Sequence, residues 1–60
     1  MSFENAGSFE EESITIEPAF NGKELELIVE KNEYLDIDAA IRLRDYLNHA
    51  IGIYEGTIDE

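Results

Sequence analysis

The sequence predicts one small α+β domain in which a β-hairpin packs against a single amphipathic helix (ββα). Residues 13–30 alternate between apolar and polar side chains on both sides of Asn21-Gly22, which is typical of paired strands. Residues 36–51 repeat apolar side chains at helical spacing. A length of 60 residues allows one domain at most. We therefore expect the folded domain over residues 13–54.

The alternating stretch also predicts the register of the two strands. Asn21-Gly22 suits a type I′ turn, because both of its central residues need a positive φ. A two-residue loop there pairs Ile16 with Leu27. The shared apolar face then consists of Ile14, Ile16, Pro18, Leu25, Leu27 and Val29. Pro18 has no amide proton to donate, which indicates a strand end or edge. A hairpin alone is barely stable in water, so this face needs a helix.

Residues 36–51 predict that helix. Asp36 suits the N-cap, and Asp38 places a second carboxylate in the first turn, where the helix dipole favours it. Gly52 suits the C-terminal stop. The stripe that should cover the hairpin consists of Ala39, Ala40, Leu43, Tyr46, Leu47, Ala50 and Ile51.

The two ends of the chain show neither periodicity. Residues 1–12 contain Gly7-Ser8 and three consecutive glutamates, a composition typical of disorder. We predict a disordered acidic segment there and an acidic tail over residues 55–60. A short third strand within the tail, around Gly56 to Ile58, stays an open alternative.

Three β-branched side chains have no place in this packing. Ile37 and Ile41 lie beside Arg44, off the centre of the helical stripe, and Ile28 points away from the packed face of the hairpin. Single exposed apolar residues are ordinary, but three in so small a chain predict a second buried surface. We take Ile28, Ile37, Ile41 and Arg44 as a candidate surface for a partner or for homo-oligomerisation.

The charge of the chain is strongly negative: 15 Asp and Glu against 4 Lys and Arg give a net charge of −11. This balance argues against direct binding of nucleic acid, which depends on Lys and Arg at phosphates, and against anionic membranes. It favours basic partners. No apolar run approaches the ~20 residues of a membrane span. The N-terminal residues lack the features of a signal peptide, so we expect a cytoplasmic protein.

The acids of the hairpin form a pattern. Glu24, Glu26 and Glu30 should project from one side of a strand, with about 6.6–6.8 Å between alternate residues. Glu17 projects to the same side from the neighbouring strand, and Glu33 extends the charge. These five glutamates are the candidate partner-binding face. Such a ribbon of carboxylates can occupy a groove built for phosphates. The alternative is a solvated sheet face that charge protects against aggregation.

No catalytic or metal signature accompanies these surfaces. Asp36-Ile37-Asp38 opens like a calcium loop, but Ile41 and Leu47 stand where an EF-hand needs its glycine and its last glutamate. His49 has no visible nucleophile or orienting group, and the chain contains no cysteine. We predict a protein that is not an enzyme and that needs no cofactor or metal.

In size, charge and architecture, residues 13–52 resemble the small accessory proteins that bacteriophages encode. Several of those proteins inhibit host nucleases, restriction or CRISPR enzymes, or transcription, some by imitating DNA. The resemblance implies an inhibitor that occupies a basic, nucleic-acid-binding site on a host or defence protein in the host cytoplasm. It implies no site residues. The alternative is a small homo-oligomeric structural or adaptor protein whose acids serve only solubility.

Overall fold

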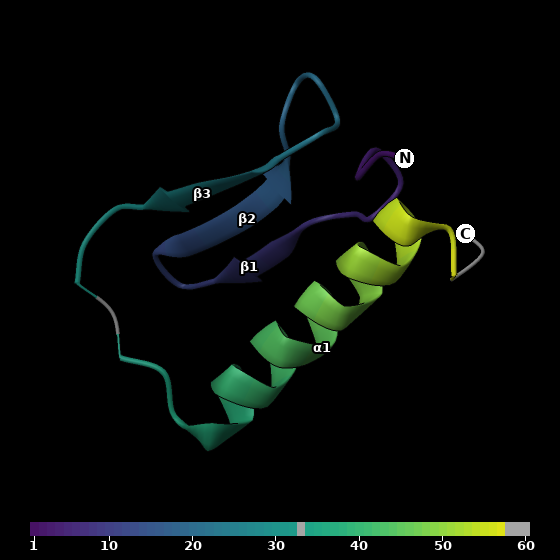
Figure 1. The fold of residues 1–60 in the computed structure, drawn as a ribbon. Coiled ribbons are helices and arrows are strands. Elements are labelled where there is room, and N and C mark those ends of the chain that lie inside the picture. The colour runs from purple at the N-terminus through teal and green to yellow at the C-terminus, as the bar shows by residue number, and fades with distance from the viewer. Residues whose placement is uncertain (33, 58–60) are drawn as a thin grey trace.

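A computed structural model describes residues 1–32 and 34–57 of the chain. It contains a three-stranded antiparallel sheet in the order β1-β2-β3, with one helix beside it (Figure 1). The elements are β1 (Phe9–Glu11), β2 (Ile14–Pro18), β3 (Leu25–Val29) and α1 (Ile37–Glu55). The predicted α+β class, with a hairpin and one helix, is confirmed. The sheet has one strand more than the sequence indicated.

The β2–β3 hairpin has the predicted register, pairing Ile14 with Val29, Ile16 with Leu27 and Pro18 with Leu25. A shift by one residue would turn every apolar side chain to the opposite face, so the alternation of the two strands determines the register strongly.

The turn of this hairpin differs from the predicted type I′. Gly22 has a φ of +71°, but Asn21 is not among the residues with positive φ. The Ala19 amide donates to the Glu24 carbonyl, and the Gly22 amide donates to the Ala19 carbonyl. Asn21 Oδ1 accepts a hydrogen bond from the Lys23 amide at 2.9 Å. This side-chain bond supports a longer loop that needs only one left-handed residue.

The N-terminal segment is folded, which contradicts the prediction of disorder for residues 1–12. β1 pairs with β2, and Ala6 and Phe9 are only 5% and 8% exposed. The Phe3 amide donates to the Gly22 carbonyl at 2.7 Å, and the Phe3 ring centroid lies 4.6 Å from that of Tyr54. The burial of Phe9 and the ring contact of Phe3 with Tyr54 outweigh the acidic composition that suggested disorder.

Helix α1 begins as predicted and ends later than predicted. The Asp36 side chain caps it by accepting the Ala39 amide at 2.8 Å. Gly52 lies inside the helix and is not its stop. Gly56, with a φ of +77°, ends the helix, and the Thr57 amide donates to the Gly52 carbonyl. Glycine adopts this left-handed conformation without a Cβ penalty.

The predicted tail therefore begins inside the helix. Glu55 is the last residue of α1, and Gly56 and Thr57 belong to the turn that ends it. The third strand considered around Gly56 to Ile58 involves no residue up to Thr57, and Ile58 lies outside the described residues.

The core lies between α1 and the β1 side of the sheet. Phe9 and Ile16 contribute to it from the sheet, and Ala39 and Ala50 from the helix. No large side chain among the described residues is fully buried. The surface of 4479 Å² exceeds the roughly 3,950 Å² typical of a folded monomer of 6.8 kDa. The fold is therefore open, with a small core and an excess of exposed surface.

Candidate partner-binding surfaces

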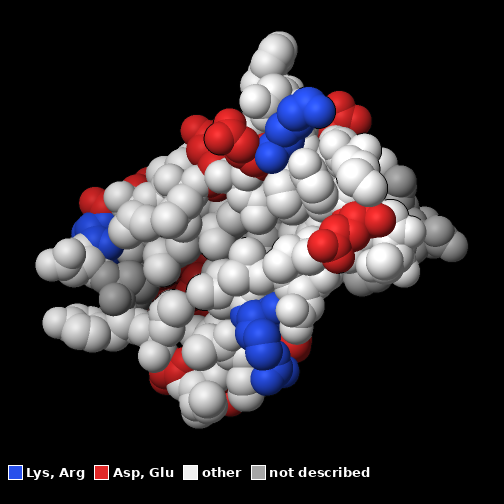
Figure 2. Space-filling model, in the orientation of Figure 1, with Lys and Arg blue, Asp and Glu red and all other residues white. Residues whose placement is uncertain are grey.

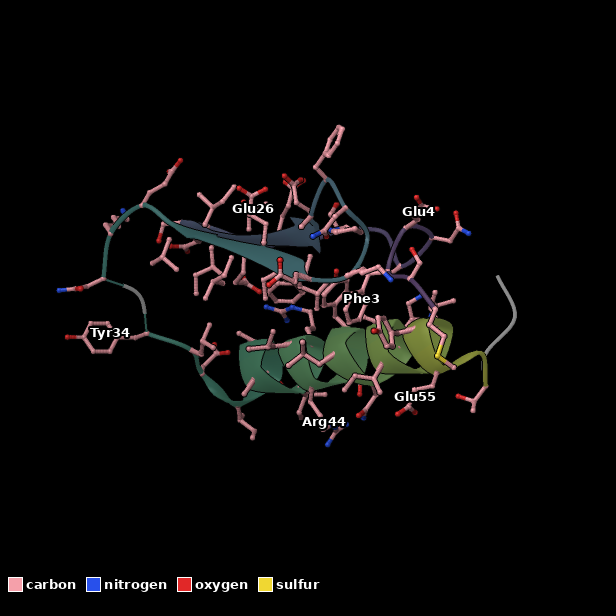
Figure 3. The ribbon with its side chains drawn as sticks, turned by 45° about the horizontal axis from the view of Figure 1, so that its top comes forward. Phe3, Glu4, Glu26, Tyr34, Arg44 and Glu55 are labelled. Carbon is pink, nitrogen blue, oxygen red and sulfur yellow. The ribbon has the colours of Figure 1, made fainter. Side chains whose placement is uncertain are left out.

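The acidic face is the side of the sheet that points away from α1. Phe9 and Ile16 point toward the helix, so the residues at alternate positions point outward. Figure 3 shows Glu26 on the side of β3 that is remote from α1. The outward residues of the three strands are Glu10, Thr15, Glu17, Glu26 and Ile28.

Two glutamates stand directly opposite each other on this face. Glu17 and Glu26 are cross-strand partners in the β2–β3 ladder. The side-chain ion pairs within residues 1–32 and 34–57 are Arg42–Glu11 and Arg44–Asp45, so neither glutamate has a cationic partner there. Like charges in direct opposition destabilise a sheet. The pair therefore costs folding free energy.

The other predicted acids continue this face or lie outside the described residues. The Glu24 carbonyl accepts from Ala19, and the Glu30 amide donates to the Ser13 carbonyl at 3.0 Å, so both extend the β2–β3 ladder beyond β3. Their spacing from Glu26 places them on its side of the strand. Glu33 lies outside the described residues. Glu10 of β1 also lies on this face. The predicted face did not include Glu10, because its segment was expected to be disordered.

The four residues of the predicted apolar surface do not form one patch. Ile28, 40% exposed, lies on the acidic face of the sheet. Ile37 and Ile41, 72% and 37% exposed, lie on the side of α1 opposite Tyr46, at ~100° per residue. Arg44 shares that side, pairs with its neighbour Asp45 at 3.0 Å and points away from the sheet (Figure 3). The structure thus brings together Ile37, Ile41 and Arg44 and leaves Ile28 apart.

The sequence does not indicate a further surface, which arises because α1 packs near β1 and leaves β3 uncovered. The Tyr46 ring lies 5.8 Å from the Phe9 ring of β1, and β3 is the strand farthest from the helix (Figure 1). Leu27 and Val29, expected to lie under the helix, are 62% and 51% exposed. The prediction that the helix covers the whole apolar face of the hairpin is therefore wrong for these two residues. The unexpected strand β1 supplies Phe9, and the helix packs on that ring instead.

The flank of α1 that faces away from the β1 contact is also apolar. Arg42 reaches Glu11 of β1 at 2.6 Å from one side of the helix. Helical spacing puts Leu43 and Leu47 on the other side, toward the open part of the sheet, with Ile51 next to them. Ile51, expected in the packed stripe, is 47% exposed. Figure 2 shows an uncharged area across this side of the molecule, between the charged side chains.

Two polar contacts hold α1 against the N-terminal segment. The Tyr46 hydroxyl donates to the Gly7 carbonyl at 3.0 Å, and burial, followed by the charge of Glu17, raises the pKa of Tyr46. The hydrogen bond and the charge of Glu11 raise the pKa of Arg42. Tyr46 is therefore neutral and Arg42 cationic near neutral pH, and both link α1 to the N-terminal segment.

A shallow hollow lies between the N-terminal turn and the C-terminal end of α1. Figure 3 shows Phe3 and Glu4 above the end of the helix that carries Glu55. Its lining residues are Met1, Ser2, Glu4, Asn5, Ile53, Tyr54, Glu55 and Gly56. Within this lining, Ser2 Oγ accepts a hydrogen bond from the Glu4 amide at 3.0 Å.

In residues 1–32 and 34–57, no group of three His, Asp or Glu side chains is arranged to hold a metal ion. In the same part of the chain, no helix combines the length and the apolar character needed to cross a bilayer.

Comparison of this chain with protein-family models, with curated proteins and with solved structures found no match.

Proposed function

We propose that this protein is a non-enzymatic binding module whose acidic sheet face occupies a basic site on a larger protein. The observation that carries the proposal is the direct opposition of Glu17 and Glu26. This pair costs stability in a chain too small to have much to spare. A cationic partner would turn the same repulsion into attraction, because each carboxylate then meets a Lys or Arg side chain.

The concrete form that we propose is an inhibitor of a nucleic-acid-handling protein. Basic grooves that bind phosphates attract any surface with regularly spaced negative charge. The acidic face offers carboxylates along β3 and across to β2, and the net charge of −11 would steer it toward such a groove. The resemblance to phage accessory proteins supports a host or defence protein as the target, reached in the host cytoplasm. Imitation of DNA is the mechanism that this surface favours.

The test is capture from host lysate followed by competition with duplex DNA. Bound proteins should be nucleic-acid-binding proteins, and duplex DNA should displace them. Rising salt should weaken the complex, because exposed charges are screened over about 10 Å at 0.1 M. A complex that resists both salt and DNA would contradict the proposal.

Charge-neutralising variants make the test specific. We expect Glu17→Gln combined with Glu26→Gln to weaken binding about tenfold or more, equivalent to about 1.4 kcal/mol. The same variant should stabilise the fold by about 0.2–1 kcal/mol, because the opposed charges are gone. Glu4→Gln with Glu55→Gln removes the same charge at the other surface and is the matched control. Equal binding by the two double variants would contradict a role for the acidic face.

The alternative function is a homo-oligomeric structural or adaptor protein, in which the acids serve solubility. The exposure of Ile37, at 72%, favours it. Ile37→Asp or Ile41→Asp should then convert a dimer into a monomer on light scattering. A wild-type protein that is already monomeric at high concentration would exclude this alternative.

A further inference from the structure

Strand β3 has an open edge with unpaired backbone groups. The hydrogen bonds from Ala19 to Glu24 and from Glu30 to Ser13 show which residues of this strand face β2. In an antiparallel ladder the intervening residues point their N–H and C=O groups the other way. The residues whose backbone N–H and C=O groups point to the open edge are Leu25, Leu27 and Val29. Among the described residues no strand pairs with that side of β3. Such an edge is a template for another strand.

β3 lacks lysine, proline and β-bulges, three features that usually protect a sheet edge, and the charge along it is acidic. Charged side chains such as Lys, proline and β-bulges blunt edge strands in monomeric proteins. Residues 25–29 contain one charge, Glu26, and no lysine or proline, and the ladder with β2 is regular. The opposite edge strand, β1, is only three residues long and lies beside the helix. The two edges are therefore unequal, because β3 offers a longer strand for pairing than β1.

The two sides of the open edge have different chemistry. One side carries Glu24, Glu26 and Glu30. The other carries Leu27 and Val29, 62% and 51% exposed. A strand added beside β3 would place its alternate side chains against these two surfaces. The edge therefore selects for alternation: basic side chains on one side of the incoming strand and apolar side chains on the other.

A second copy of this chain fits the edge poorly. In a two-fold antiparallel pair of β3 strands, the glutamate-bearing faces of both copies lie on the same side of the joined sheet only in every second register. Centring the pair on Leu27 places Glu24 opposite Glu30 of the second copy, and centring it on Ile28 places Glu26 opposite Glu30. Both of these registers oppose like charges directly, and each copy carries a net charge of −11. Charge complementarity selects an occupant of opposite sign.

We propose that the β3 edge binds an extended, basic segment of the partner protein as a fourth strand. The segment alternates Lys or Arg with apolar residues; its basic side chains meet the acidic face, and its apolar side chains cover Leu27 and Val29. This inference rests on the proposed function, since it identifies the part of the basic partner that is recognised. Backbone hydrogen bonds supply affinity, and the two surfaces supply specificity.

The probe is a seven-residue synthetic peptide that alternates lysine and valine. The control peptide has the same composition with its lysines grouped at one end and its valines at the other. We expect the alternating peptide to bind about tenfold more tightly, and to slow hydrogen exchange at the amides of Leu25, Leu27 and Val29 but not in β1. Equal affinity of the two peptides, without protection of those amides, would overturn strand addition. That result would leave salt-sensitive capture by the acidic face, and with it the proposed function, untouched.

Backbone variants test the hydrogen bonds directly. The Leu27 amide points outward, so Leu27→Pro leaves the β2 ladder paired while it removes the central donor; Leu27→Ala keeps that donor. We expect Leu27→Pro to bind the peptide about tenfold more weakly than Leu27→Ala, the effect of one or two net hydrogen bonds.

N-methylated peptides test the same backbone hydrogen bonds without a protein variant. N-methylation at its valines blocks an antiparallel strand, and N-methylation at its lysines blocks a parallel one. Unchanged affinity of both methylated peptides would overturn the proposal.

Discussion

Replacing Phe9 by alanine tests whether the acidic N-terminal segment belongs to the fold. The Phe9 ring is 8% exposed and packs 5.8 Å from the ring of Tyr46. Truncation of a buried phenylalanine typically costs about 3–5 kcal/mol. The core here is shallow and open to water, so we expect a loss near the lower limit, about 3 kcal/mol. A domain of this size has roughly 3–9 kcal/mol of stability in total, so the loss is a third or more of it.

The assay is urea denaturation followed by far-ultraviolet circular dichroism. Phe20→Ala makes the same chemical change at a fully exposed ring in the β2–β3 loop and is the matched control. It should change stability by less than about 0.5 kcal/mol. Phe9→Leu keeps part of the burial and remains measurable if Phe9→Ala does not fold. Equal stability of Phe9→Ala and Phe20→Ala would refute the packing of β1 under the helix.

Three further predictions concern single contacts. Gly22→Ala should destabilise the fold more than Gly7→Ala. Both positions have a left-handed φ, so either alanine costs about 1–2 kcal/mol. Only at Gly22 would the new Cβ lie 2.7 Å from a side-chain oxygen, the Oγ of Ser2. Equal losses in urea denaturation would contradict that contact. Burial raises the pKa of Tyr46 above 10.0, so the folded state holds this proton more tightly; stability should be full below pH 10 and fall as the pH rises through the raised value. Tyr46→Phe should lack this component, and an unchanged pH profile would argue against it. Asp36→Ala should cost about 1 kcal/mol as a lost N-cap. Asp45→Ala, with the same change of charge at an exposed pair, should cost less than about 0.5 kcal/mol, and equal losses would count against the cap.

The elements that the sequence predicts correctly are those with a strong local signal. Alternation over residues 13–30 determines the hairpin register, and Asp36 marks the start of the helix. The end of the helix was predicted wrongly because Gly52 and Gly56 carry the same signal, and only the backbone conformation decides between them.

Strand β1 has no comparable signal. A strand of three residues, Phe9–Glu11, is too short to display a period. The place of β1 in the sheet depends on the Phe9 ring, which lies next to Ile16 and Tyr46. Ile16 is across a turn from Phe9, and Tyr46 is far from it in the sequence. This is a tertiary preference that overrides local composition. It also explains the position of α1, and hence the exposure of Leu27 and Val29, which apolar alternation alone cannot distinguish from burial.

The acidic charge and the open apolar edge of β3 make sense only together. An exposed strand with Leu27, Ile28 and Val29 would pair with further copies of itself if nothing opposed it. The net charge of −11 opposes self-association at long range, and Glu24, Glu26 and Glu30 oppose it residue by residue. In the proposed complex, the same charges would attract a basic segment. The acids would then oppose self-pairing and favour the proposed partner at the same edge, which is how repulsion contributes to specificity. The opposition of Glu17 and Glu26 adds nothing to solubility that separated glutamates would not add, whereas in the proposed complex each of these carboxylates would meet a cationic side chain.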